Sequence, residues 1–166
     1  TWLKHVPELA HGNRTPAGVP CVVQLLGSDA DNMAVNALEA VRHGADKIDL
    51  NFGCPAPTVN KHQGGAILLK EPQRVFEIVH TIRQSLPETV VLSAKMRLGF
   101  EHQDLALDCA CAIAQAGAAE LTVHARTKVE GYEPPAHWAW VRKIQAAVSI
   151  PVTANGDVFS LADYLD

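Results

Sequence analysis

The chain has 166 residues, enough for one compact domain whose core buries roughly 70% of the unfolded surface. Hydrophobic residues make up 48% of the sequence and charged residues 19%, which excludes a disordered chain and a coiled coil. The net charge of −4 argues against nucleic-acid binding by bulk charge alone. No apolar run approaches the ~18 residues of a membrane span and no leader pattern is visible, so we expect a soluble, cytoplasmic protein.

Five short, β-branched segments that are followed by polar loops predict buried parallel strands. These segments are Cys21–Leu26, Asp46–Asn51, Val90–Met96, Glu120–His124 and Pro151–Ala154. Amphipathic helices are predicted between them. The first is capped by Ser28 and Asp31 and ended by Gly44, and the second follows Pro72. The others cover about Asp104–Gln115 and Trp138–Val148, and a last one begins at Ser160, capped by Asp163.

Alternation of strand and helix predicts a parallel sheet, either doubly wound or a (β/α)8 barrel. We favour the barrel, because the unusual polar residues stand at the carboxyl ends of the strands and no GxGxxG follows the first strand. Five strands cannot close a barrel of eight. Residues 1–166 are therefore expected to form an incomplete TIM-barrel catalytic domain whose open sheet edges favour a homodimer.

The segment after the second strand, Asn51-Phe52-Gly53-Cys54-Pro55, places a thiol on a loop stiffened by proline. Cys54 is either a functional thiol held over the barrel mouth or a small apolar filler, and the residues alone leave both interpretations open. The other three cysteines are interpreted as small apolar filler: Cys21, Cys109 and Cys111. No CxxC pair or histidine cluster predicts a metal site.

Cations and polar groups end the remaining strands. Burying the charged Lys95 side chain within a strand costs free energy, so Lys95 either pairs with a carboxylate such as Asp49 or stabilises negative charge on a ligand. Arg97, His124 and Arg126 follow at neighbouring strand ends. The last strand leads into an Asn155-Gly156-Asp157 turn, and a Gly64-Gly65 pair marks either a tight helix entry or a ligand approach.

Taken in order, five motifs resemble the tRNA-dihydrouridine synthases, over nearly the whole chain. The motifs are Val23-Gln24-Leu25-Leu26-Gly27, Asp49-Leu50-Asn51-Phe52-Gly53-Cys54-Pro55, Lys95-Met96-Arg97-Leu98-Gly99, Val123-His124-Ala125-Arg126-Thr127 and Ala154-Asn155-Gly156-Asp157. The wording of the first motif, Thr58-Val59-Asn60 and Glu130-Gly131-Tyr132 favour the bacterial dihydrouridine synthase C subgroup. The resemblance implies a (β/α)8 barrel with FMN, followed by a helical tRNA-binding domain. It also implies NADPH-driven reduction of a D-loop uridine, at position 16, to 5,6-dihydrouridine in tRNA.

The resemblance also implies roles for single residues. Cys54 matches the general acid that protonates uracil C5, and an ordinary thiol is mostly protonated at neutral pH. Asn51 matches a contact to the target uracil, and Arg97, Arg126 and Tyr132 are predicted to contact ligand or tRNA. The remaining matches are contacts to FMN: Gln24, Lys95, His124, Asn155, Gly156 and Asp157.

Against the family pattern, the first strand and the last two strands are absent, as is the helical tRNA-binding domain. We therefore expect this chain alone to bind FMN weakly or not at all and to be inactive. One alternative is an FMN barrel of the dihydroorotate dehydrogenase kind, which shares the strand-end Asn and Lys. A second alternative is a barrel fragment without turnover.

Overall fold

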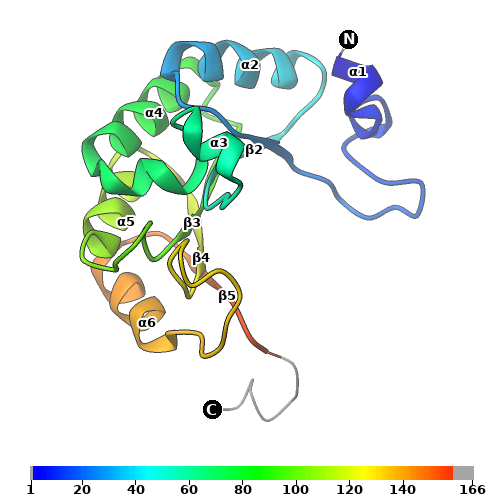
Figure 1. Ribbon diagram of the computed structural model, residues 1–166. Coiled ribbons are helices and arrows are strands. Elements are labelled where there is room, and N and C mark those ends of the chain that lie inside the picture. The colour runs from blue at the N-terminus through cyan, green and yellow to red at the C-terminus, as the bar shows by residue number, and fades with distance from the viewer. Residues whose placement is uncertain (1, 159–166) are drawn as a thin grey trace.

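The computed structural model describes residues 2–158, which form one five-stranded parallel sheet with helices against one side. The strand order β1-β2-β3-β4-β5 follows the chain, as expected for successive βα units. Figure 1 shows α2, α4, α5 and α6 along the outer side of an arc and the strands along its inner side. The molecule is therefore part of a (β/α)8 barrel, which confirms the predicted fold class.

All five predicted strands are present: β1 (Val23–Leu25), β2 (Lys47–Phe52), β3 (Val91–Arg97), β4 (Glu120–His124) and β5 (Val152–Asn155). Only β4 has the predicted bounds. The largest difference is in β1, which begins at Val23 instead of Cys21. Among the described residues β1 has a partner on one side alone, so fewer of its residues form ladder hydrogen bonds.

Four long helices connect the strands, as the sequence predicts: α2 (Ala30–Arg42), α4 (Pro72–Ser85), α5 (Ala106–Gln115) and α6 (Trp138–Ala147). The structure also has four short helical segments: α1 (Trp2–His5), η1 (Pro7–His11), α3 (Pro57–Lys61) and η2 (Gly65–Lys70). Only η2 was anticipated, because a helix entry was one of the two interpretations of Gly64-Gly65. The helix predicted from Ser160 lies outside the described residues.

The predicted cap of α2 is wrong. Asp29 is the N-cap, and its carboxylate accepts a hydrogen bond of 2.8 Å from the backbone N–H of Asn32. Ser28 instead donates its hydroxyl to the carbonyl of His62, while Asp31 lies within the first turn of the helix. Ser28 and Asp29 are both residue types that cap helix N-termini. The Ser28 hydroxyl is bonded to the distant His62 carbonyl, and Asp29 is the residue that caps the helix.

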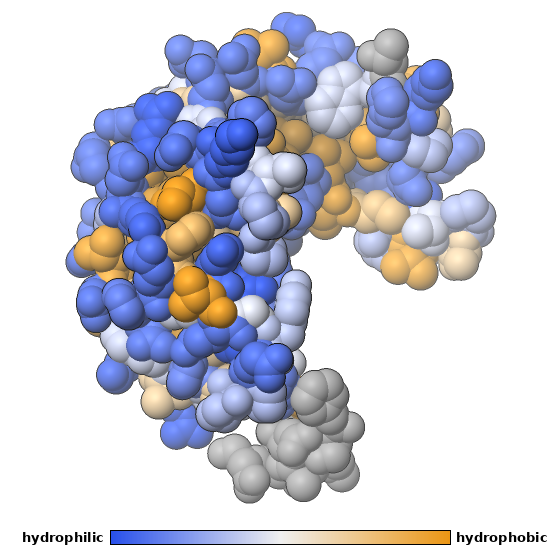
Figure 2. Space-filling view, viewed as in Figure 1, coloured by the Kyte–Doolittle hydropathy of each residue, from blue (hydrophilic) through white to orange (hydrophobic). Residues whose placement is uncertain are grey.

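Alternation along the strands separates two faces of the sheet. On β2, the side chains of Ile48, Leu50 and Phe52 are buried in the core beneath the helices. The intervening residues Asp49 and Asn51 are half-buried on the inner face of the arc. Figure 2 shows that the molecule is hollowed on the side away from the helices. The sheet thus has an apolar face that holds the fold together and a largely polar face that opens into the hollow.

The edges of the sheet are β1 and β5, each paired on one side among the described residues. Association of two copies through these edges stays a prediction. No helix within residues 2–158 is both long enough and apolar enough to span a bilayer.

Candidate active site

A cavity of about 460 Å³ opens at the carboxyl ends of β2–β5, where a barrel builds its active site. Every predicted site residue lines this cavity except Gln24, and Gly53, Pro55 and Met96 complete the lining. The predicted residues in the lining are Asn51, Cys54, Lys95, Arg97, His124, Arg126, Tyr132, Asn155, Gly156 and Asp157. Cys54, in the loop after β2, and Lys95, on β3, therefore line the same cavity.

The loop that carries Cys54 is fixed by contacts to its backbone. The Cys54 carbonyl accepts hydrogen bonds from the backbone N–H of Ala66 and from Asn60 Nδ2, both at 3.1 Å. Gly65 has φ +68°, and a Cβ there would lie 2.8 Å from the Cys54 carbonyl oxygen. The Gly64-Gly65 pair therefore marks both the entry of η2 and a close approach, although the approaching group is the Cys54 loop itself.

Asn60 is a buried residue that the sequence argument did not single out by role. Its Nδ2 also donates to the Ala56 carbonyl at 2.7 Å, and its Oδ1 accepts from the backbone N–H of Ile67 at 2.8 Å. One amide side chain thus connects the cysteine loop to η2. The position of this asparagine after a proline-rich turn was visible in the sequence, but its partners depend on the fold of the loop.

Arg97 ties together two loops of the cavity rim. It is 2% exposed, and its Nε donates to the Gly53 carbonyl at 3.0 Å. Its Nη1 donates to the carbonyls of Thr127 at 3.0 Å and Gly131 at 2.7 Å. The guanidinium also lies 5.1 Å from the ring centroid of Tyr132, an exposed residue of the second loop. Arg97 therefore serves its own chain with three hydrogen bonds, and its predicted contact with ligand or tRNA stays a prediction.

Lys95 makes a different contact from the ion pair that was considered for it. Its Nζ donates to Asn155 Oδ1 at 2.8 Å, across β4, and no ion pair with Asp49 is present among the described residues. Burial lowers the pKa of Lys95, the nearby charge of Arg97 lowers it further, and Asp49 opposes both. The ammonium is thus held at the cavity by a neutral partner.

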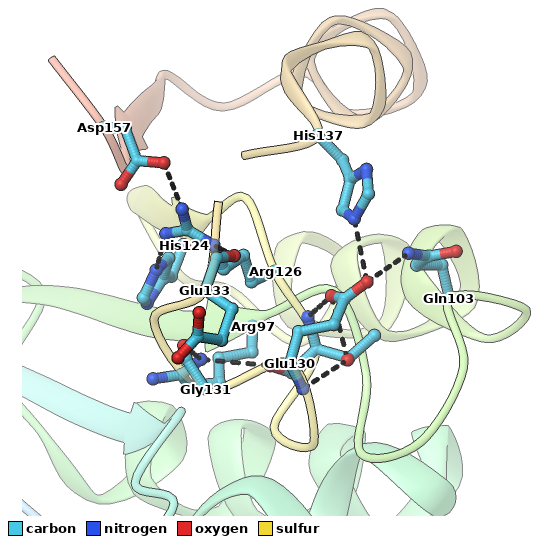
Figure 3. A network of polar contacts seen from close by, with 10 residues as sticks. Arg97, Gln103, His124, Arg126, Glu130, Gly131, Glu133, His137 and Asp157 are labelled. Atoms are coloured by element: carbon cyan, nitrogen blue, oxygen red, sulfur yellow. Dashed lines mark hydrogen bonds and ion pairs between the residues drawn. The ribbon is translucent and has the colours of Figure 1, made fainter. Parts of the chain in front are cut away.

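His124, Arg126 and Asp157, which all line the cavity, lie together in Figure 3. Arg126 is 1% exposed, forms an ion pair with Asp157, and donates from Nε to the Glu133 carbonyl at 2.6 Å. Burial lowers the pKa of His124 to about 4, and the charges of Arg97, Lys95 and Arg126 act in the same direction. His124 is therefore a neutral imidazole at neutral pH. Like Arg97, Arg126 binds its own chain, and its contact with a ligand stays a prediction.

The loop after β4 is closed by a second polar network, also drawn in Figure 3. Glu130 accepts hydrogen bonds from the backbone N–H and the hydroxyl of Thr127, at 2.6 and 2.9 Å, and lies 2.8 Å from His137 Nε2. Burial alone would raise the pKa of Glu130, but the bonds from Thr127 and His137 outweigh it and hold the pKa below its usual range. This network fixes the loop that presents Tyr132.

Gly156 is closely approached by another part of the chain. A Cβ at Gly156 would lie 2.8 Å from the indole of Trp138, at the start of α6. Among the other cysteines, Cys109 is buried as predicted, and burial raises its thiol pKa to about 12. Cys21 and Cys111 are half-buried. Within residues 2–158 no cluster of His, Cys, Asp or Glu could hold a metal ion.

The family model "Dihydrouridine synthase" matches residues 4–166. The chain belongs to the dihydrouridine synthase family. It is 73% identical to a tRNA-dihydrouridine(16) synthase of Neisseria meningitidis serogroup A over 99% of this chain and 50% of that protein. It is 56% identical to a protein of the same name from Aquipseudomonas alcaligenes, over 99% of this chain and 52% of the relative. This dihydrouridine synthase chain thus spans about half the length of the curated relatives it matches.

Among solved structures, one similar chain is a Toxoplasma gondii protein assigned as a deoxyribose-phosphate aldolase, with a TM-score of 0.55 and 19% identity. The match covers 98% of this chain and 62% of that one. At this identity the likeness concerns the fold alone, and it supports the partial barrel of this family member.

Proposed function

We propose that residues 1–166 are part of the catalytic barrel of an enzyme that reduces a uridine of tRNA, at position 16, to 5,6-dihydrouridine. The observation that carries the proposal is the placement of Cys54, Lys95 and Asn51 around one cavity in a chain of this family. The names of the 73% and 56% identical relatives support both the substrate and the position. We also propose a cytoplasmic location for the protein, because tRNA is its proposed substrate.

The family is flavin-dependent, with NADPH as its general reductant. The residues present fit a flavin ring. The cavity lies within the range of ~300–1,000 Å³ that is usual for ligand pockets, and cationic and amide groups line it. Lys95 Nζ, neutral His124 and the Asn155-Gly156-Asp157 turn would hold the ring of FMN. When bound and reduced by NADPH, FMN supplies the hydride that uracil accepts at C6.

The protein's own chemistry is the second half of the reduction, a proton delivered to C5. The Cys54 thiol donates this proton, after which the thiolate regains a proton from solvent. Because the loop backbone is held at the Cys54 carbonyl, the thiol stays in one place over the cavity. The ammonium of Lys95, which lines the cavity, would stabilise negative charge on a bound flavin ring. The target base must leave the tRNA stack to enter the cavity, at a cost of a few kcal/mol.

The test is reduction of tRNA from a strain that lacks dihydrouridine at position 16. The protein is expressed from its own gene with any sequence that flanks these residues. Cys54→Ala is expected to slow dihydrouridine formation by about 10²–10⁴-fold, the usual size of general-acid catalysis, with bound flavin retained. Cys111→Ala, a half-buried thiol on α5, is the matched control and should leave the rate unchanged.

Two results would contradict the proposal in different ways. If the wild-type protein forms no dihydrouridine, the assigned activity is wrong. If Cys54→Ala is as active as wild type, the activity stands and the assigned acid is wrong. The alternative of a dihydroorotate dehydrogenase-like enzyme predicts oxidation of the reduced protein by orotate instead of tRNA, and no observation in the structure favours it.

A further inference from the structure

A row of polar side chains lies one layer below the cavity, on the inner face of the sheet. Gln24 on β1, Asp49 on β2 and Ser93 on β3 are direct register partners across the three strands. Their side chains are joined: Ser93 Oγ donates to Asp49 Oδ1 and Gln24 Nε2 donates to Asp49 Oδ2, both at 2.7 Å. The carboxylate of Asp49 is thus bonded from both neighbouring strands.

The row continues upward into the cavity. Asn51 Nδ2 donates to Gln24 Oε1 at 2.9 Å, and the backbone N–H of Gly53 donates to Asn51 Oδ1 at 2.9 Å. Both ends of the Gln24 amide are therefore hydrogen-bonded within the chain, and Gln24, an exposed residue of β1, does not line the cavity. A chain of hydrogen bonds leads from the carboxylate of Asp49 to the first residues of the cysteine loop.

The two ends of this chain dictate its direction. A carboxylate only accepts hydrogen bonds, so Gln24 must turn its NH₂ group toward Asp49 and its carbonyl toward Asn51. Asn51 must then turn its NH₂ group toward Gln24. The backbone N–H of Gly53 only donates, which requires the same orientation from the other end. If the side-chain amide of either Gln24 or Asn51 were flipped, donors would face donors and acceptors would face acceptors along the chain of hydrogen bonds.

The consequence reaches the cavity through Asn51. The second hydrogen of its Nδ2 makes no hydrogen bond within residues 2–158, and Asn51 lines the cavity. The side chain therefore offers an N–H donor, and not a carbonyl, to whatever enters. A uracil ring has carbonyl oxygens at C2 and C4 that would accept this bond. A bond to the C4 carbonyl would distinguish a uridine from a cytidine, whose amino group at C4 would meet donor with donor, whereas the C2 carbonyl is common to both bases.

We infer that Asp49 and Gln24 are positioning residues which orient the Asn51 amide as a donor toward a carbonyl of the target base. This inference rests on the proposed function. It gives Gln24 a role in substrate positioning, where the family resemblance implies a contact with FMN. Only one hydrogen of its Nε2 remains for any such contact.

A competing account is that Asp49 acts by charge on Lys95. Asp49 does raise the pKa of Lys95, but burial and Arg97 both outweigh it, and the ammonium is bonded to Asn155 instead. The two accounts separate in Asp49→Asn. This variant removes the charge but keeps an oxygen that can accept from Gln24, with its NH₂ group facing the Ser93 hydroxyl.

The experiment is a double-mutant cycle on uridine reduction by the flavin-loaded protein, with kcat/KM and KM for tRNA as readouts. Asp49→Ala is expected to lower kcat/KM about tenfold, chiefly through KM, because it frees the Gln24 amide to rotate. Asp49→Asn should cost less than about threefold. In an Asn51→Ala background, Asp49→Ala should add less than about twofold, since its effect passes through Asn51. The spectrum of bound flavin should be the same in all variants.

Gln24→Leu keeps the bulk of the side chain and removes both amide groups, so it should match Asp49→Ala in size and in its lack of additivity with Asn51→Ala. If Asp49→Asn is as impaired as Asp49→Ala, or if either effect multiplies with that of Asn51→Ala, the inference is overturned. An inactive wild-type protein would instead overturn the proposed function. A change of the flavin spectrum in Asp49→Ala would favour the account through Lys95.

Discussion

The two faces of the sheet carry side chains of different character. Side chains on the outer face of β2 and β3, such as Leu50 and Leu92, are fully buried among the helices and apolar. On the inner face of the same strands, Asp49 and Lys95 are half-buried and polar, and each is hydrogen-bonded to a side chain of another strand. The strand period of two therefore assigns stability to one face and chemistry to the other.

The difference shows how a partial barrel can hold an active site in place. The stability that the outer face contributes does not depend on the ligand, because apolar burial is non-directional. The inner face depends on the direction of each donor and acceptor, so a single wrong amide changes what the cavity presents. Substitutions on the outer face should alter folding free energy, while those on the inner face should alter ligand chemistry.

The largest effect on stability is expected on the outer face. Leu92→Ala removes a fully buried side chain near the start of β3 and should lower the free energy of unfolding by about 2–5 kcal/mol. Its neighbour Val91 is 37% exposed, and Val91→Ala should cost much less, within about 1 kcal/mol. Urea unfolding of both variants measures this. Equal losses would break the comparison of the two faces.

An intermediate effect is expected at Asn60, where a polar group supports the fold from within. Asn60→Ala leaves the N–H of Ile67 without its acceptor and removes one of two donors to the Cys54 carbonyl, which should cost about 1–3 kcal/mol. Asn36→Ala is the matched control, because Asn36 is exposed on α2 and bonds only to its own helix. Chemical denaturation of the two variants gives the answer, and a loss at Asn36 as large as that at Asn60 would refute the assignment.

An effect that depends on pH is expected from protonation of His124. Its pKa is about 4 in the folded protein and ~6.5 when unfolded, so the unfolded chain binds the extra proton first as the pH falls. The contribution of His124 to stability is therefore present above about pH 6.5 and is lost as the pH falls toward about 4. A series of urea unfolding curves over this range should show a steeper fall for wild type than for His124→Gln. Parallel curves would mean that burial does not keep the imidazole neutral.

The sequence was informative wherever a property repeats along the chain. Strand alternation and the polar residues after each strand predicted the sheet order and almost the whole lining of the cavity. The sequence was less informative about the hydrogen-bond partners of individual side chains. Lys95 was expected to meet either Asp49 or a ligand, and its partner Asn155 lies two strands away. The capping residue of α2 and the role of Asn60 depend on loops far along the chain, and no local pattern encodes them.

The three carbonyls held by Arg97 have a consequence for engineering the family. Because one guanidinium binds the turn after β2 and the turn after β4, neither loop can be lengthened or exchanged without disturbing the other. A lysine at this position would offer a single point of attachment and could not span both. Loop exchanges between members of the family must therefore carry the two loops and their shared arginine together.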